Sequence, residues 1–190
     1  LAYARERARS EGLDGQVEFV EGDYREIGGE YDVFVSVGML EHVGPAHYAE
    51  LGAAMERCLR PEGRGLIHSI GRDRPGSLNR WIEHRIFPGA QPPAISQMTA
   101  LFEPWGLSVL DLENLRLHYA RTLEHWLARF DAHADQVREQ FDPEFERAWR
   151  LYLAGSVAAF RCGTLQLFQV LFSRSQSNTI PWTRAHLYQD

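Results

Sequence analysis

Residues 33–44, VFVSVGMLEHVG, constrain the fold of this chain most strongly. The first part is a nearly continuous run of β-branched and aromatic residues, typical of a parallel strand covered on both faces. Gly38 ends the run, and Glu41 and His42 follow it closely. Ligands of open α/β sheets bind beyond the carboxyl ends of the strands. The sequence therefore predicts a buried strand at 33–37 with a functional loop after it; a helix-capping Glu41 and a structural His42 are the alternative.

The rest of the chain alternates between helical and strand patterns. We expect helices over 1–12, 46–59 and 94–105, and strands over 16–20, 33–37, 65–70, 107–110 and 164–172. The Pro-Glu-Gly turn at 61–63 should separate a helix from a strand, and the last strand should lie antiparallel at one edge or be slotted into the sheet. This alternation with short turns predicts a doubly wound α/β fold.

Two long helical patterns occupy much of residues 122–161, with a break near 141–143. Aromatic residues recur along them. We expect a helical, substrate-covering insertion over about 119–161, before the last strand, with plain core packing as the alternative. The chain also opens directly in a helical pattern with no strand before it. We therefore expect a single domain over 1–190 that lacks the first strand or strands of its sheet.

Composition excludes several classes of function. The formal charge of −6 and the isoelectric point near 5.8 argue against general nucleic-acid binding. The two cysteines, Cys58 and Cys162, show no pattern of a disulfide framework or zinc site, and His42 and His47 are not spaced to share a metal; no metal is expected. No stretch reaches the roughly 20 apolar residues of a membrane span. A reducing, cytoplasmic compartment fits this composition best.

Residues 72–87 combine four arginines with Trp81, Ile82, Ile86 and Phe87. A solvated surface helix is one interpretation. The other is a lid whose arginines touch anionic lipid head groups while its apolar side contacts acyl chains or membrane.

Five segments, taken together, resemble a known family in order and spacing. They are GDYRE (22–26), VSVGMLEHVG (35–44), LRPEGRGLIHSIG (59–71), HYARTL (118–123) and LQLFQVLFSR (165–174). The chain resembles the C-terminal half of the cyclopropane fatty acid synthases, which include the mycolic acid cyclopropane synthases. These enzymes use S-adenosylmethionine to methylenate the cis double bond of an unsaturated acyl chain. The resemblance implies a Rossmann-like class I methyltransferase sheet.

The resemblance also implies the roles of individual residues. A bicarbonate ion would be bound by Glu41, His68, the backbone amide of Ile70 and Tyr119, with His42 in a supporting position. S-adenosylmethionine would be bound by Gly22, Asp23 and Tyr24 near the adenine and by Val37 and Gly38 beside the sulfonium. The family's glycine-rich loop, its ribose-binding acidic residue and a cysteine of the bicarbonate site would precede the first residue of this chain.

The implied substrate is an unsaturated phospholipid acyl chain, met by a cytoplasmic enzyme at the inner face of the membrane. A homodimer is left open. Two other functions compete with this one: a small-molecule amine N-methyltransferase on the same scaffold, in which Glu41 and His42 would bind the amine, and a non-catalytic lipid-binding fragment. The HYARTL segment and the 72–87 segment favour the lipid. The residues do not distinguish a cyclopropane product from a methylene or methyl branch.

Overall fold

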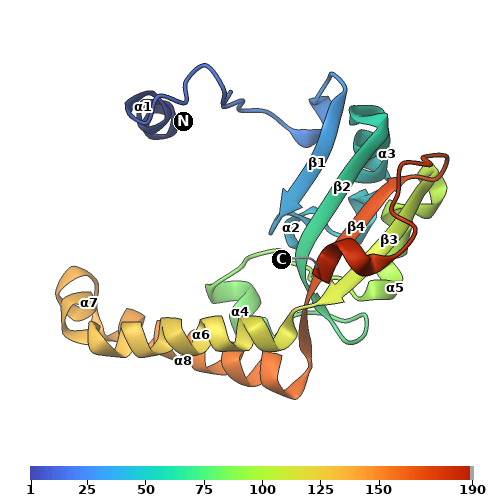
Figure 1. The fold of residues 1–190 in the computed structure, drawn as a ribbon. Helices are drawn as coiled ribbons and strands as arrows, with labels where there is room; N and C mark the ends of the chain where they lie inside the picture. The colour runs from blue at the N-terminus through green and yellow to red at the C-terminus, as the bar shows by residue number, and fades with distance from the viewer. Residues whose placement is uncertain (189–190) are drawn as a thin grey trace.

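The computed structural model of the chain describes residues 1–188 and contains one open sheet (Figure 1). The strands are β1 (Tyr31–Val37), β2 (Leu59–Arg72), β3 (Leu107–Asn114) and β4 (Leu165–Arg174), in the order β1-β2-β4-β3. β1 and β2 are parallel, whereas β4 is antiparallel to both of its neighbours. This mixed open sheet with helices confirms the α/β class. It also confirms the last strand as one slotted into the sheet.

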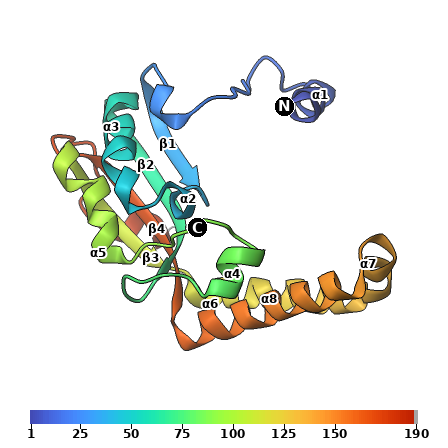
Figure 2. The ribbon, with the colours of Figure 1, turned by 180° about the vertical axis from the view of Figure 1, so that it is seen from behind.

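The helices fall into two groups. Near the sheet lie α2 (Leu40–Val43), α3 (Tyr48–Cys58) and α5 (Ile95–Met98), while α4 (Arg80–Arg85) lies beside the long arm described next and α1 (Ala2–Ser10) stands apart. The helices α6 (Arg116–Ala132), α7 (Ala134–Gln140) and α8 (Pro143–Cys162) form a long arm. Figure 2 shows α3 and α5 on the same face of the sheet, and the arm projecting from one end of it.

Two apolar clusters hold these groups together. The first joins α3 to the sheet, where Leu51, Met55, Ile67 and Phe172 are fully buried. The second joins α6 to α8 and includes Leu123, Leu153 and Phe160. Leu167 of β4 belongs to this second cluster, so the arm is packed onto the end of the sheet. Each fully buried aliphatic or aromatic side chain contributes about 1.5–3 kcal/mol.

The prediction that strand 33–37 is covered on both faces is wrong. Val33, Val35 and Val37 are 64%, 57% and 66% exposed, whereas Ser36 between them is buried. Successive side chains of a strand point to opposite faces. In the described chain α3 lies against one face of the sheet, and the exposure of the three valines places them on the other face.

The strand predicted at 16–20 is also wrong, because these residues have no regular structure. Val17 and Val20 are exposed. An alternating pattern becomes a strand only where its backbone can pair with a neighbour. No strand pairs with this segment in the part of the chain that the structure describes.

Other boundaries moved for similar reasons. The strand predicted at 65–70 begins at Leu59 and runs through the predicted 61–63 turn, because this stretch pairs with Tyr31 at an irregularity of β1. The helix predicted at 94–105 is α5 followed by two short 3-10 turns, Thr99–Leu101 and Glu103–Trp105. The predicted break near 141–143 is confirmed: the Asp142 carboxylate accepts the Phe145 N–H at 2.7 Å and starts α8. The arm, however, has three helices and begins at Arg116.

Among residues 1–188, the helices include none with the length and apolar content that a membrane span requires.

The close packing of β2 against β4 yields a stability prediction. A Cβ atom at Gly65 would lie 2.0 Å from the ring of Phe172, which is fully buried and has no room to move. Gly65→Ala should therefore lower the free energy of unfolding by about 1–3 kcal/mol. The matched control is Gly155→Ala in α8, where a Cβ meets nothing within 4 Å. It should raise stability by about 0.5–1 kcal/mol through helix propensity. Urea unfolding of both variants tests this, and equal effects would contradict it.

Candidate functional site

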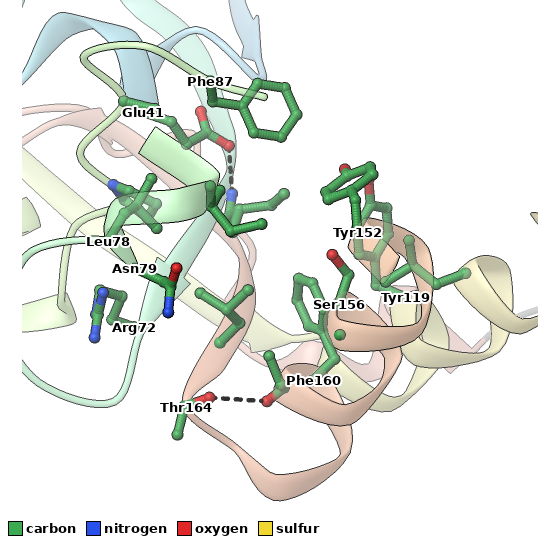
Figure 3. A pocket seen from close by; sticks show the side chains of 18 of the residues that line it. Glu41, Arg72, Leu78, Asn79, Phe87, Tyr119, Tyr152, Ser156, Phe160 and Thr164 are labelled. Atoms are coloured by element: carbon green, nitrogen blue, oxygen red, sulfur yellow. Dashed lines mark hydrogen bonds between the residues drawn. The ribbon is translucent and has the colours of Figure 1, made fainter. Parts of the chain in front are cut away.

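A pocket of about 640 Å³ lies between the end of the sheet and the arm (Figure 3). Its lining comes from the loop after β1, the ends of β2 and β4, and the helices α6 and α8. Residues 78–87, which contain α4 and are called the α4 segment below, complete it. Most of the lining is apolar, contributed by Ile70, Leu78, Trp81, Ile82, Phe87, Leu123, Leu151, Phe160 and Leu165. The polar groups are few. Size and composition are those of a site for an apolar small molecule.

Glu41 is the buried charged group of this pocket. Gly38, whose φ of +67° suits glycine, turns the chain out of β1 into α2, where Glu41 is only 7% exposed. Its Oε1 atom accepts the backbone N–H of Ile70 at 2.6 Å. Its Oε2 atom is buried and has no hydrogen-bond partner among the described residues. Burying a carboxylate oxygen without a hydrogen-bond partner costs free energy, so this atom is available to accept a hydrogen bond from a ligand.

Two tyrosines of the arm line the same pocket, Tyr119 on α6 and Tyr152 on α8. The Tyr119 ring packs edge-on against Phe160, with 4.9 Å between centroids. Burial, followed by the nearby Glu41 charge, raises the pKa of Tyr119 above its ordinary value. Burial and the nearby Tyr119 raise the pKa of Tyr152 in the same way. Both phenols therefore stay protonated at neutral pH and can donate hydrogen bonds.

A continuous series of aromatic rings leads along α8 to the Glu41 loop. The rings in contact are Phe141–Phe145 at 4.3 Å, Phe145–Trp149 at 5.8 Å, Trp149–Tyr152 at 5.1 Å, Tyr152–Phe87 at 5.7 Å and Phe87–His42 at 6.3 Å between centroids. The series connects the α4 segment to the arm. It places His42 at the pocket wall beside Phe87.

His68 lies outside the pocket lining. It sits on β2 in register with Val37, and its Nδ1 atom faces the amide Nε2 of Gln169 at 3.1 Å. Of the four groups expected at the bicarbonate site, the structure brings Glu41, Ile70 and Tyr119 together. The Ile70 N–H is already donated to Glu41.

Of the five residues expected to bind a cofactor, three line one of two cavities, and Gly22 and Asp23 line neither. Gly38 lines the large pocket, whereas Tyr24 and Val37 line a second cavity of about 280 Å³ between β1 and α3. A Cβ at Gly22 or Gly38 would meet nothing within 4 Å, so the backbone is open to a ligand at both.

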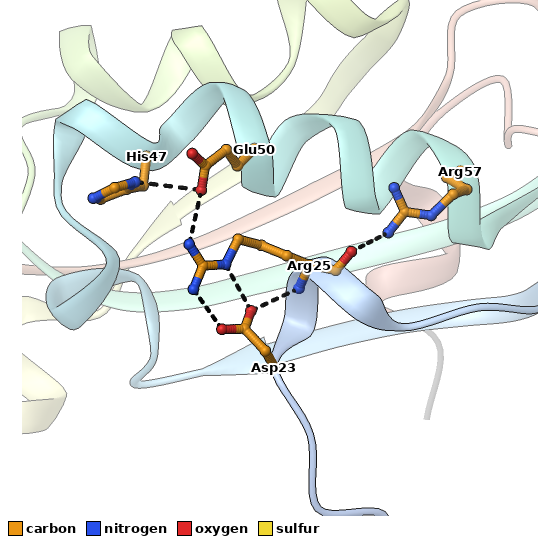
Figure 4. A network of polar contacts seen from close by, with 5 residues as sticks. All are labelled: Asp23, Arg25, His47, Glu50 and Arg57. Carbon is orange, nitrogen blue, oxygen red and sulfur yellow. Dashed lines mark hydrogen bonds and ion pairs between the residues drawn. The ribbon is translucent and has the colours of Figure 1, made fainter.

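The Asp23 carboxylate, by contrast, is engaged in a polar network (Figure 4). It accepts the backbone N–H of Arg25 at 2.9 Å and pairs with the Arg25 guanidinium, which also reaches Glu50 at 3.4 Å. Arg57 donates to the Arg25 carbonyl at 3.0 Å. Hydrogen bonds from Arg25 hold the pKa of Asp23 at about 2. This network ties the turn of residues 23–26 to α3.

Sequence reasoning placed Arg72 among the arginines of the 72–87 segment, and Tyr152 and Phe160 among the aromatic residues of the insertion, but it named none of the three as a site residue; all three line the pocket. For the two aromatic residues a signal existed, since Phe145, Trp149, Tyr152 and Phe160 share one face of α8 at helical spacing. The helical spacing does not show that this face of α8 lines a pocket with the sheet. Within the described part of the chain, no three His, Cys, Asp or Glu side chains are grouped so as to hold a metal ion.

Comparison with known proteins decides the family. The family model described as mycolic acid cyclopropane synthetase matches residues 1–170. The chain belongs to this family. Over 171 residues it is 37% identical to the cyclopropane-fatty-acyl-phospholipid synthase of Escherichia coli K12, covering 90% of this chain and 44% of that protein. It is 34% identical over 200 residues to a probable fatty acid methyltransferase of Pseudomonas putida, covering 100% of this chain and 51% of that protein. The chain thus spans about half the length of these curated relatives.

Solved structures support the same fold. The mycolic acid cyclopropane synthase CmaA1, solved with SAH and CTAB, superposes with a TM-score of 0.75 at 24% identity, covering 88% of this chain and 66% of that one. The cyclopropane synthase MmaA2 from Mycobacterium tuberculosis gives a TM-score of 0.74 at 24% identity, covering 87% of this chain and 65% of that one. The mycolic acid cyclopropane synthetase family therefore accounts for both the sequence and the architecture of this chain.

The network around Asp23 predicts a pH dependence. The pKa of Asp23 is about 2 in the folded chain against an ordinary 3.8, so its contribution to stability is complete above about pH 4 and is lost as the pH falls through about 2. The difference in melting temperature between the native chain and Asp23→Asn should be constant from neutral pH down to about pH 4 and shrink below it. A carboxyl NMR titration should show the low pKa directly. In Arg25→Gln, the same titration should return the Asp23 pKa toward its ordinary value; an unchanged value would contradict this account.

Proposed function

We propose that this chain forms the acceptor-binding and catalytic part of an S-adenosylmethionine-dependent enzyme that converts the cis double bond of an unsaturated phospholipid acyl chain into a cyclopropane. The observation that carries the proposal is the apolar pocket that is lined both by a buried carboxylate with one unpaired oxygen and by a protonated tyrosine. Family membership supports it.

The pocket suits an alkene substrate. An acyl chain gains free energy from burial against such a lining, about 25 cal/mol per Å² of apolar surface removed from water. An alkene is also a weak, uncharged nucleophile, so it must be aligned with the methyl donor and shielded from water. The rings of Phe87, Tyr119, Tyr152 and Phe160 supply that shielding. Their faces would stabilise positive charge developing on the acyl chain.

The residues present fit the methyl donor in part. S-adenosylmethionine supplies an electrophilic methyl group on a sulfonium. Gly38 would allow its close approach at the mouth of the pocket, and Tyr24 and Val37 would pack against it from the adjoining cavity. Asp23 would contribute by shaping the turn, because Arg25 already occupies its carboxylate.

The residues also fit a bicarbonate ion through two groups. The unpaired Oε2 of Glu41 would accept the hydroxyl of the ion, and the phenol of Tyr119 would donate to one of its oxygens. The bound ion would supply a base close to the acyl chain. Ile70 would act through Glu41, whose carboxylate its N–H orients. His68 lies on the same face of β2 as Ile70 but two residues further from the end of the strand, and it would act by supporting β2 through Gln169, because it does not line the pocket.

We further propose that the enzyme meets its lipid at the inner, cytoplasmic face of the membrane. Two features of the α4 segment support this placement. Trp81 and Ile82 line the pocket, whereas His84 and Arg85 are exposed on the same short helix. Exposed basic groups next to an apolar opening suit a surface of anionic lipid.

The proposal predicts the effect of two substitutions. In the protein expressed from its complete gene, with S-adenosylmethionine, bicarbonate and vesicles of cis-unsaturated phospholipid, the extracted acyl chains should gain the mass of one CH₂ unit. Glu41→Gln and Tyr119→Phe should each slow this gain about a hundredfold or more, because each removes a group that binds or orients the base. Mass spectrometry of the fatty acids measures the rate. The controls Glu139→Gln and Tyr3→Phe change exposed side chains outside the pocket and should leave the rate unchanged.

Two results would contradict the proposal. Unchanged rates in both pocket variants would remove Glu41 and Tyr119 from the chemistry. Intact cofactor binding without a mass gain on any lipid would remove the lipid substrate, and methylation of a small amine under the same conditions would assign the chain to the amine N-methyltransferases.

A further inference from the structure

We infer that Arg72 forms an anion subsite within the pocket that binds the phosphodiester of the phospholipid whose acyl chain occupies the apolar part. This inference rests on the function proposed above and adds to it the binding of the charged head of the substrate. It also distinguishes Arg72 from the other arginines of the 72–87 segment.

The first observation is that Arg72 is a pocket arginine without a carboxylate partner among the described residues. Of the described residues that line the pocket, it is the one lysine or arginine. No carboxylate in the described chain lies within ion-pair distance of it. Arg74, two residues further on, is 84% exposed, lies 4.0 Å from Asp73 and does not line the pocket. The sequence alone could not separate these two arginines.

The second observation is that the Arg72 side chain is fixed by one hydrogen bond, while its buried Nε–H group has no acceptor among the described residues. Its backbone N–H donates to the Pro93 carbonyl at 2.9 Å, and its Nη1 atom donates to the Ser77 carbonyl at 2.5 Å. Its Nε atom is buried and has no partner among the described residues. A guanidinium partly withdrawn from water without a counter-ion is unfavourable. An anion bound beside it would remove that cost.

The third observation is that a second hydrogen-bond donor, Asn79, lines the pocket together with Arg72. Asn79 lines the same pocket, and its Oδ1 atom accepts the N–H of Trp81 at 2.9 Å, which leaves the amide NH₂ as a donor. Figure 3 shows Arg72 and Asn79 on the side of the pocket formed by β2 and the α4 segment, away from Tyr119 and Tyr152 on the arm. The donors for an anion and the two pocket tyrosines therefore come from different walls.

The chemistry of the ligand follows from these groups. A guanidinium presents several N–H groups in one plane and matches the oxygens of a phosphate or carboxylate. A substrate that combines an ionised head with a long apolar tail uses both parts of the pocket. We assign the phosphodiester of a phospholipid, because the exposed basic residues beside the pocket would face the phosphate layer of a membrane.

A binding experiment tests the subsite without requiring turnover. Isothermal titration calorimetry measures binding while the protein from its complete gene is titrated with a short-chain phosphatidylglycerol or with the methyl ester of the same acyl chain. The native protein should bind the phosphodiester about tenfold or more tightly than the ester, as expected for a charged hydrogen bond. Arg72→Met should remove this preference and leave ester binding unchanged. Arg74→Met should keep it.

Further arms separate the remaining explanations. If Arg72→Met proves unstable, Arg72→Gln is the second variant: it keeps a polar side chain with N–H donors but lacks the charge, so it should also lose the preference. Equal binding of phosphodiester and ester by the native protein would overturn the subsite while leaving the lipid pocket intact. Binding of inorganic phosphate as tight as that of the lipid, or of a free fatty acid carboxylate tighter than it, would overturn the phosphodiester assignment. Absence of binding by any acyl ligand would overturn both this inference and the proposed function.

Discussion

The pocket is organised by the hydrogen bond between the Ile70 amide and the Glu41 carboxylate. It joins the loop after β1 to the neighbouring strand β2 at the end of the sheet, and it orients a charge that is almost fully buried. Because one oxygen of that carboxylate is satisfied and the other is not, the fold presents a single acceptor in a largely apolar space. A carboxylate in water would have neither this orientation nor this unmet demand for a donor.

The arm supplies the second wall of the pocket. Tyr119, Tyr152 and Phe160 belong to α6 and α8, and these helices reach the sheet through Leu167 of the inserted strand β4. The same aromatic residues pack the two helices together and wall the pocket. Packing and function are therefore not alternatives for this stripe, and substitutions within it should be judged by stability as well as by activity.

Much of the architecture could be predicted from the sequence, because it depends on local patterns. The loop from Gly38 to Glu41, the break before Pro143 and the presence of a last strand over 164–172 all follow from residue types and their spacing, whereas its position between β2 and β3 came from the structure. The failures share a cause. The pattern at 16–20 and the valines of β1 satisfy the rules for strands and burial, but both outcomes require a partner that lies elsewhere in space. None pairs with 16–20 or covers Val33, Val35 and Val37 in the described chain.

By itself, the sequence determined the α/β class, the family resemblance and the position of Glu41 after a strand, because these are set by residue identity and short-range order. The tertiary structure decided which side chains share the pocket. It brought Tyr119 and Arg72 to one cavity with Glu41, and it placed His68 away from that cavity although only one residue separates it from Ile70. The physical reason is that long-range packing sets the distance between α6, α8 and the sheet, and the arm packs at the end of β2, where Ile70 and Arg72 lie; His68 is on the same face of the strand but two residues further from that end.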